Sequence, residues 1–295
     1  MEDTGRPTDS YRLIHTANMV GLFTCMFVKA ALYNRIHSIR SSEVKRGMGG
    51  FHGNKVSLPF QLHSLQADCV LKGAVIVRFI LDDSSFCFVN CHLAAGQTQT
   101  SARNNDITAI MESVVFPKVG EIESANESFV NGGDGSMIHD YEICFLNGDL
   151  NYRIDTMGRD AVIKAVKSNS LVKLLERDQL RVAQRRNPVF PLRSLQEAPI
   201  AFAPTYKYDI GSASYDSSEK RRSPAWCDRI LHKRSSRIRQ LNYLRHELQI
   251  SDHRPVSALF TASVKQISTS KRVATQAQAA ELFNAEMESF SNQTK

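Results

Sequence analysis

The sequence lacks any long hydrophobic run. Its longest mainly apolar stretch, Met19–Val28, is ten residues long and is followed by Lys29, whereas a membrane-spanning helix needs about 20 apolar residues. The first residues, Met-Glu-Asp-Thr-Gly, are acidic where a secretory signal peptide would be basic. We therefore expect neither a transmembrane helix nor a cleaved secretory leader.

Paired cysteines and a disorder-promoting composition are also missing. With 42% hydrophobic and 23% charged residues among 295, the chain has the composition of an ordinary globular protein. Disorder, coiled coil and collagen are excluded as its main state, and the length suits one large α/β domain or two small ones. No Cys-x-x-Cys pair occurs, so we expect reduced, mostly buried thiols in a cytosolic compartment. The six cysteines are Cys25, Cys69, Cys87, Cys91, Cys144 and Cys227.

Acidic residues are scarce in one part of the chain. The formal net charge is +7, and residues 219–239 alone contain eight Lys and Arg against two acids. Such a stretch predicts one basic patch for an anionic partner, such as nucleic acid, a phosphorylated small molecule or an anionic membrane. From charge alone, a solvated basic loop is an equally good interpretation.

Strand patterns dominate, with helical patterns between them. Two consecutive strands are predicted over 72–80 and 86–93, and a helix is predicted over 103–115. One or two further helices are expected between 159 and 186, and a solvated helix or linker in the last thirty residues. Other strand candidates are 20–28, 142–146, 201–208, 229–232 and 256–260. Polar motifs gather at strand ends, which indicates an α/β sandwich whose loops carry the function.

Four of these polar motifs have the residue types that phosphate ester hydrolysis requires. That reaction needs a base for water, donors for the non-bridging oxygens and usually a divalent cation. His92, Asn151 and His253 are suitable donors. Asp149 and Asp252 can act as base, histidine partner or metal ligand. The four motifs lie at 90–93, 148–153, 224–229 and 251–255.

These motifs resemble those of the inositol polyphosphate 5-phosphatase family, within the endonuclease/exonuclease/phosphatase fold related to DNase I. The resemblance rests on FLNGDLNYRID at 145–155, PAWCDRIL at 224–231 and SDHRPV at 251–256. PAWCDR separates the 5-phosphatases from the nucleases and sphingomyelinases of the same fold. The resemblance extends from about residue 11 to 260. It implies a four-layer α/β sandwich of two mixed β-sheets, from a fungal-like eukaryotic source, with a catalytic domain at 1–262 and a polar helical tail or linker at 263–295.

The resemblance also implies a role for each matching residue. Asp149 would be the general base that activates water for attack on the 5-phosphate, and Asn151 would hold that phosphate. His92 and His253 would stabilise charge on the phosphoryl oxygens. Asp252 would orient the site beside a Mg²⁺ ion and is its possible ligand.

A second implied set binds the other phosphates of the substrate. Tyr206, Lys207, Lys220 and Arg222 resemble the residues that hold the neighbouring 4-phosphate, which explains the basic stretch through clustered Lys and Arg donors. Phosphoinositide lipid at an anionic membrane surface is then the expected partner. Nucleic acid is not, because stacked aromatic platforms are not evident. The full set of implied substrate-binding residues is Asn54, Lys55, Arg153, Tyr206, Lys207, Lys220 and Arg222.

The family's first motifs have no counterpart in this sequence. A strand with Trp-Asn-Val-Asn and a strand ending in Gln-Glu supply the Asn and Glu of the family's magnesium site. Asn18 and Glu43 stand in other sequence contexts. We therefore expect a chain that begins after the Gln-Glu strand, with exposed sheet edges and apolar neighbours. Without the Glu the cation loses its main anionic ligand, so weak or no activity is expected.

The family's Gly-Asn-Lys-Gly-Ala-Val is interrupted. Gly53-Asn54-Lys55 is followed by seventeen additional residues, Val56–Lys72, and only then by Gly73. Val-Ser can be encoded as GTAAGT, a splice donor, and Lys as AAG, a splice acceptor. We interpret residues 56–72 as a translated intron. The alternative is a genuine surface insertion, which loops tolerate at small entropic cost.

Together these observations predict a cytoplasmic enzyme, peripheral on membranes, that removes the 5-phosphate of phosphatidylinositol 4,5-bisphosphate or related inositol polyphosphates, with impaired activity. Two alternatives stay open. One is a non-catalytic phosphoinositide-binding pseudophosphatase that keeps Lys207, Lys220 and Arg222 but lacks the metal site. The other is a nuclease of the same fold, which PAWCDR disfavours. Protein partners stay unassigned.

Overall fold

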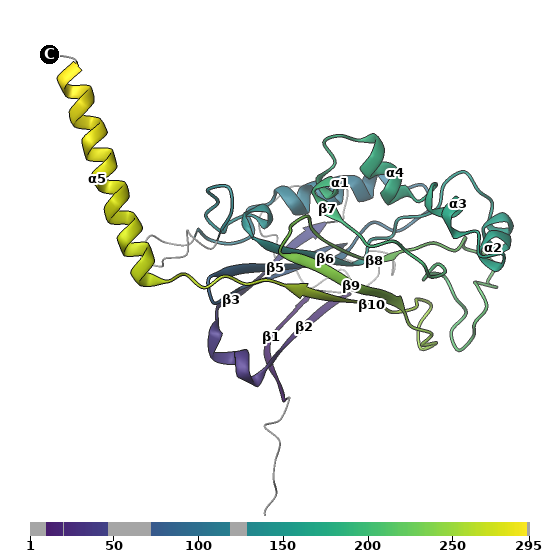
Figure 1. Ribbon diagram of the computed structural model, residues 1–295. Helices are drawn as coiled ribbons and strands as arrows, with labels where there is room; N and C mark the ends of the chain where they lie inside the picture. Colours follow the sequence, from purple (N-terminus) through teal and green to yellow (C-terminus); the bar gives the residue numbers. More distant parts are fainter. Residues whose placement is uncertain (1–9, 20, 47–71, 119–128, 294–295) are drawn as a thin grey trace, which may run out of the picture.

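A six-stranded mixed sheet organises the fold of the computed structural model, which describes residues 10–19, 21–46, 72–118 and 129–293 (Figure 1). The strand order is β3-β4-β5-β6-β8-β7, in which β5 and β6 are parallel and the other neighbours antiparallel. These strands are β3 (Ile36–Arg46), β4 (Lys72–Leu81), β5 (Ser84–His92), β6 (Ile143–Asp149), β7 (Leu195–Gln196) and β8 (Asp228–Lys233).

The central strand β4 explains why the sequence shows an unbroken apolar run. All residues from Gly73 to Ile80 are buried, because both faces of the sheet are covered. On one face Ile76 and Val89 pack against helix α1 (Thr100–Glu112), through residues such as Ile107. The opposite face contributes a row of phenylalanines from β4, β5 and β6. The predicted strands 72–80 and 86–93 and the predicted helix 103–115 are confirmed.

The second β layer consists of two separate antiparallel pairs. β1 (Tyr11–Met19) pairs with β2 (Leu22–Lys29), and β9 (Ile238–Arg245) pairs with β10 (Val256–Ala262). Within the described residues the two pairs do not bond to each other, so the second sheet of the expected sandwich is divided. Phe23 and Phe27 on β2 are 65% and 60% exposed beside an apolar groove of about 490 Å³.

Helices cover the other face and the ends of the sheet. Between 159 and 186 three helices form rather than one or two, because Asn169 and Asp178 interrupt the pattern; the Asp178 side chain caps the last of them by accepting from the Arg181 backbone N–H. They are α2 (Arg159–Lys167), α3 (Leu171–Leu175) and α4 (Gln179–Arg186). The short 3-10 helices within the described residues are η1 (Ala30–Arg35), η3 (Ile138–Asp140) and η4 (Pro191–Ser194).

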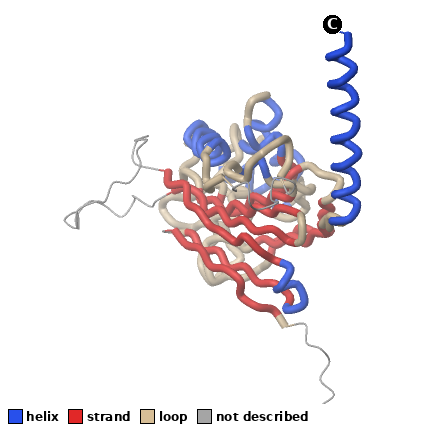
Figure 2. Tube along the Cα trace, turned by 90° about the vertical axis from the view of Figure 1, so that its left-hand side faces the viewer, coloured by secondary structure: helices blue, strands red, loops and turns tan. Residues whose placement is uncertain are grey.

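The helix α5 (Thr269–Gln293) extends away from the rest of the protein (Figures 1 and 2). It confirms the helical interpretation of the last thirty residues. Among the described helices, none combines the length and the apolar character that crossing a bilayer requires. Four of the cysteines, Cys87, Cys91, Cys144 and Cys227, are free and buried as expected, while Cys25 is exposed.

Two predictions from local sequence are wrong. Residues 201–208 form no strand: the backbone N–H groups of Tyr206 and Tyr208 donate to Ala225 and Asp252 in neighbouring loops, which leaves only isolated bridges. Strand β9 was not foreseen, because its apolar positions are interspersed with Arg, Gln and Asn. Asn54, Lys55 and residues 56–71 of the predicted insertion lie outside the described residues.

The single basic patch predicted for residues 219–239 is also wrong. Lys220 and Arg222 precede β8, whereas Lys233 and Arg237 follow at its other end. Lys233 donates to the backbone carbonyls of His139 and Tyr141, and Arg237 pairs with Glu142 at 3.0 Å. A strand of six residues spans about 20 Å, so the structure divides this charge between two regions of the surface.

Candidate active site

Three strand ends meet at one end of the six-stranded sheet. The register of β5, β6 and β8 places His92 beside Asp149 and Asp149 beside Asp228. Gly148 allows this approach: a Cβ there would lie 2.1 Å from the backbone oxygen of Cys91, and its φ of +124° suits only glycine. The chain before β10 reaches the same end and adds His253.

Asp149 is held by the turn that follows β6. Asn151 adopts a left-handed backbone conformation with φ of 55°. Its backbone N–H donates to Asp149 Oδ1 at 3.0 Å, and its side-chain amide donates to Oδ2 at 2.9 Å. The buried Arg153 donates in turn to the side-chain and backbone oxygens of Asn151. The carboxylate therefore has one fixed orientation, with lone pairs remaining on both oxygens.

The environment of Asp149 suits a general base. Burial raises the pKa of this carboxyl to about 6, and the negative charge of Asp228 adds to the increase, while His253 and Arg153 oppose it. A carboxylate whose pKa is close to neutral is a stronger base than an ordinary aspartate and is still mostly ionised at pH 7. It can therefore accept a proton from water.

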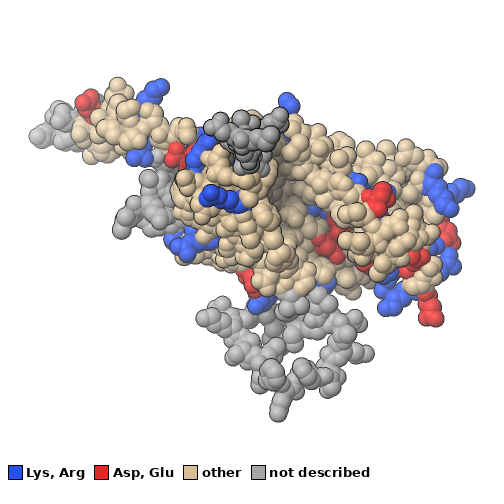
Figure 3. Space-filling model, turned by 90° about the horizontal axis from the view of Figure 1, so that it is seen from below, with Lys and Arg blue, Asp and Glu red and all other residues tan. Residues whose placement is uncertain are grey.

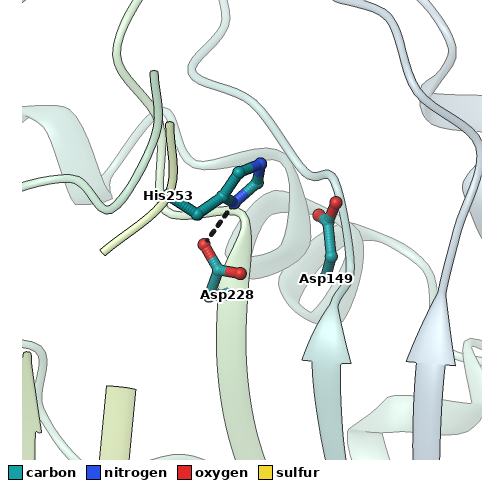
Figure 4. Close-up of side chains that lie close together, drawn as sticks. All are labelled: Asp149, Asp228 and His253. Atoms are coloured by element: carbon teal, nitrogen blue, oxygen red, sulfur yellow. Dashed lines mark hydrogen bonds and ion pairs between the residues drawn. The ribbon is translucent and has the colours of Figure 1, made fainter. Parts of the chain in front are cut away.

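His253 and Asp228 form a hydrogen-bonded pair (Figure 4). His253 Nδ1 lies 2.8 Å from Asp228 Oδ2, and the same oxygen accepts from the Thr205 hydroxyl at 2.7 Å. Burial alone would lower the pKa of His253, but the hydrogen bond and charge of Asp228, together with the charge of Asp149, outweigh it and raise the pKa. The imidazole is thus poised as a proton-bearing donor.

The same three side chains are a candidate cation site. Ligand atoms of Asp149, Asp228 and His253 lie within 4.8 Å of one another. Mg²⁺ and Ca²⁺ prefer oxygen ligands, and Mg²⁺ is commonly bound through one or two carboxylates with waters. Asp228 Oδ1 and the remaining lone pairs of Asp149 suit that demand. His253 Nδ1 is already bonded to Asp228, so the oxygens are the fitting donors.

His92 is paired with a residue that sequence reasoning missed. Its Nε2 lies 2.6 Å from Lys72 Nζ and 3.5 Å from Asp149 Oδ2. Burial and then the nearby Lys72 charge lower the pKa of His92 to about 4, so the ring is neutral near pH 7 and accepts from the ammonium group. Lys72 had been counted as the end of the insertion, although it precedes Gly73 just as Lys55 would without that insertion.

Tyr206 links the catalytic cluster to the expected phosphate-binding residues. Its ring lies between the Arg153 guanidinium, 4.3 Å from the ring centre, and the His253 ring at 4.8 Å. Its neighbour Lys207 donates to Asp252 Oδ2 at 3.0 Å. Asp252 therefore binds Lys207 and lies outside the carboxylate cluster, and the partner of His253 is Asp228 instead.

Lys220 and Arg222 lie in an exposed loop beside Lys207. The buried Asp216 organises this loop: its carboxylate accepts from the Arg222 backbone N–H at 2.7 Å, and its own N–H donates to the Lys207 carbonyl at 2.9 Å. The protein surface is hollowed near the centre of the view in Figure 3, with acidic side chains in the hollow and both basic and acidic side chains around the right-hand lobe.

The structure thus brings together most of the residues expected from the sequence. Asp228, Thr205 and Lys72 are the additional members, and only the PAWCDR motif, which contains Asp228, had indicated one of them. Glu43 lies elsewhere, with its carboxylate 3.3 Å from Lys45. The expected residues that meet around Asp149 are His92, Asp149, Asn151, Arg153, Tyr206 and His253.

Comparisons with known proteins agree with this geometry. The family described as Endonuclease/Exonuclease/phosphatase family 2 matches residues 2–259. A probable inositol polyphosphate 5-phosphatase of Schizosaccharomyces pombe is 48% identical over 269 residues, covering 90% of this chain and 21% of that protein. A type I inositol polyphosphate 5-phosphatase of Arabidopsis thaliana is 37% identical over 274 residues, covering 89% of this chain and 44% of that protein. The chain spans less than half the length of either relative.

A solved structure is similar over nearly the whole chain. It is the inositol polyphosphate 5-phosphatase domain of SPsynaptojanin in complex with inositol (1,4)-bisphosphate and a calcium ion, with 28% identity and a TM-score of 0.73. The match covers 97% of this chain and 71% of that one. The sheet and its helices are therefore the shared architecture.

Proposed function

We propose that this chain, which belongs to the Endonuclease/Exonuclease/phosphatase family 2, hydrolyses the 5-phosphate of phosphatidylinositol 4,5-bisphosphate or a related inositol polyphosphate. The observation that carries the proposal is the convergence of Asp149, Asp228 and His253 at one end of the sheet, with the pKa of Asp149 raised to about 6. Relatives named as inositol polyphosphate 5-phosphatases, and a similar structure that holds inositol bisphosphate, support the substrate class.

In the proposed reaction water attacks the phosphorus while the bond from phosphorus to the inositol 5-oxygen breaks. Asp149 takes a proton from the attacking water, Asn151 keeps the carboxylate oriented, and the leaving inositol oxygen takes a proton from solvent. His253, whose other nitrogen is held by Asp228, donates to the phosphoryl oxygens, and Lys72 adds positive charge beside His92. Oxygens of Asp149 and Asp228 would hold a divalent cation, which is Mg²⁺ in our proposal. When bound, this cation would supply further positive charge beside the phosphoryl oxygens of the substrate.

The rest of the proposal concerns how the substrate headgroup is bound and at which membrane surface the enzyme acts. Lys207 and the exposed Lys220 and Arg222 would bind the adjacent phosphate of the headgroup, and the enzyme would act peripherally on the cytoplasmic face of a membrane. We expect slow turnover, because Asn18 and Glu43 do not replace the family's cation ligands and because phosphate monoesters hydrolyse extremely slowly without full catalysis.

The test measures phosphate release from vesicles containing phosphatidylinositol 4,5-bisphosphate and from soluble inositol 1,4,5-trisphosphate. We expect slow, Mg²⁺-dependent release that Asp149→Asn lowers by ~100-fold or more. Asp160→Asn is the matched control, since that carboxylate is 81% exposed on α2. Equal release by the wild type and Asp149→Asn on both substrates would contradict the proposal.

The two alternatives have distinct outcomes in the same experiment. Sedimentation with the vesicles that Lys220→Ala abolishes, without any phosphate release, would identify a non-catalytic binding protein. Nicking of plasmid DNA that Asp149→Asn removes would identify a nuclease.

A further inference from the structure

A charged groove of about 750 Å³ lies at the β7 edge of the sheet, away from the catalytic site. It is bordered by α4, η4, β7 and the residue that follows β8. Four arginines line it, together with the amide side chains of Gln184 and Gln196. These arginines are Arg181, Arg185, Arg193 and Arg234.

Within the described part of the chain, none of these four guanidinium groups forms an ion pair. Arg185 donates to the backbone carbonyl of Glu176 at 2.6 Å, and Arg234 donates to that of Arg193 at 3.3 Å. Each of these contacts uses a single nitrogen, so most of the N–H donors stay available. Arg181 and Arg185 are four residues apart on α4 and share one face of that helix.

The acid that borders the groove does not neutralise it. Both oxygens of Glu197 accept from the buried Arg229, at 2.7 and 2.6 Å, and Oε1 also accepts from the Tyr243 hydroxyl. Arg229 binds Asp178 as well. This buried trio carries one net negative charge, which offsets one of the four arginines. A surplus of three positive charges remains.

Converging like charges are unfavourable unless an anion occupies the space between them. Arginine is the side chain best matched to phosphate, because its planar fork donates two parallel hydrogen bonds to phosphate oxygens. We propose that this groove is a second anion site, which binds a ligand carrying two or more phosphate monoester groups.

The site is separate from the catalytic centre. Arg234 follows the last residue of β8 and Asp228 is its first residue, so the two lie about 20 Å apart along that strand. A ligand bound beside Arg234 does not reach Asp149. Binding there consequently does not depend on the proposed phosphatase activity and can be tested when catalysis is disabled.

The experiment uses the full chain carrying Asp149→Asn and titrates it with inositol hexakisphosphate by isothermal calorimetry. We expect two binding events. Arg185→Gln with Arg234→Gln should remove one event, or weaken it at least ~10-fold, while Lys220→Ala with Arg222→Ala should affect only the other. Arg186→Gln is the matched control, because it is an exposed arginine on α4 that does not line the groove.

A second arm distinguishes the source of the phosphates. If vesicles containing phosphatidylinositol 4,5-bisphosphate sediment the Lys220→Ala, Arg222→Ala protein in an Arg185- and Arg234-dependent manner, the ligand is a lipid headgroup. If only the soluble probe binds, it is a free polyphosphate. A single binding event untouched by Arg185→Gln with Arg234→Gln would overturn the proposal, as would an equal loss in Arg186→Gln or tighter binding of an oligonucleotide than of the probe. Circular dichroism confirms that each variant is folded.

Discussion

The two ends of β8 differ in how their charges are satisfied. At the catalytic end the charged groups nearest the cluster have specific partners: Asp228 with His253, Asp149 with Asn151, and Lys207 with Asp252. At the other end Arg234 donates to the Arg193 carbonyl, and neither arginine forms an ion pair with a described residue, because both oxygens of the neighbouring Glu197 are bound to Arg229. Paired groups keep their orientation before a substrate arrives, which catalysis requires. Unpaired arginines gain their partners only from a ligand, which is typical of a binding surface.

The largest expected effect is a loss of stability on replacing Arg229, which lies on β8 between these two ends. Arg229 is fully buried on β8 and holds both Asp178 and Glu197. Arg229→Met leaves two buried carboxylates without a cation, so we expect the free energy of unfolding to fall by about 3–5 kcal/mol. Urea denaturation measures the change. Arg186→Met, on the exposed side of α4, should stay within about 0.5 kcal/mol of the wild type; a similar loss in both variants would show that Arg229 has no special role.

The second prediction tests whether the catalytic end depends on preorganised pairs. Asp228→Asn removes the negative partner that keeps the proton on His253 Nδ1, so phosphate release should fall by about 100-fold. Phosphate assays at saturating substrate measure this change in kcat. The control is Asp160→Asn. Retention of full activity in Asp228→Asn would mean that His253 needs no carboxylate partner.

A third prediction concerns pH. Asp149 acts as a base only when ionised, so release should rise with pH through about 6, the value to which burial and then Asp228 raise its pKa. Release should fall again at the higher pH where His253 loses the proton that it donates. Removing the Asp228 charge takes away one cause of the increase, so the midpoint in Asp228→Asn should move to lower pH. Carboxyl ¹³C NMR of the metal-free protein gives the same midpoint independently of turnover. A midpoint that moves upward would contradict this electrostatic account.

The smallest expected effect on stability and activity follows from deleting residues 56–72, which lead into β4. Deleting residues 56–72 leaves Lys55 directly before Gly73, so a lysine still reaches His92. We expect stability within about 1 kcal/mol of the full chain, because loop closure depends weakly on length, and unchanged phosphate release. Lys72→Ala in the full chain and Lys55→Ala in the shortened one should lower release to similar degrees. Normal activity in both alanine variants would remove lysine from the site.

Much of the candidate site was predictable from sequence, because its residues follow strands within compact motifs. His92, Asp149, Asn151 and His253 all stand at strand ends in such motifs. The pairing between them was not predictable. Asp252 was expected to orient the site beside the metal, yet it binds Lys207, and the fold pairs His253 with Asp228, which is 25 residues away in the chain.

The fold was predictable to a similar extent, and the predictions that failed did so for a similar reason. Buried strands such as β4 can be predicted from the sequence because their apolar residues are continuous. Strand β9 could not, since only Ile238 and Tyr243 are buried and Arg, Gln and Asn are interspersed with its apolar residues. The segment 201–208 has strand-like residues but finds only loop partners for its backbone N–H groups.

By itself, the sequence determined which side chains are available and near which strand ends they lie, because both follow from local residue order. Only the tertiary structure decided which of them meet. It brought Lys72 to His92 through the register of β4 and β5, and it brought His253 to Asp228 through the loop before β10. It also separated the two ends of one basic stretch, because β8 carries the chain about 20 Å between them. Lys220 and Arg222 stay near the catalytic site, whereas Arg234 joins three arginines from other segments in the groove.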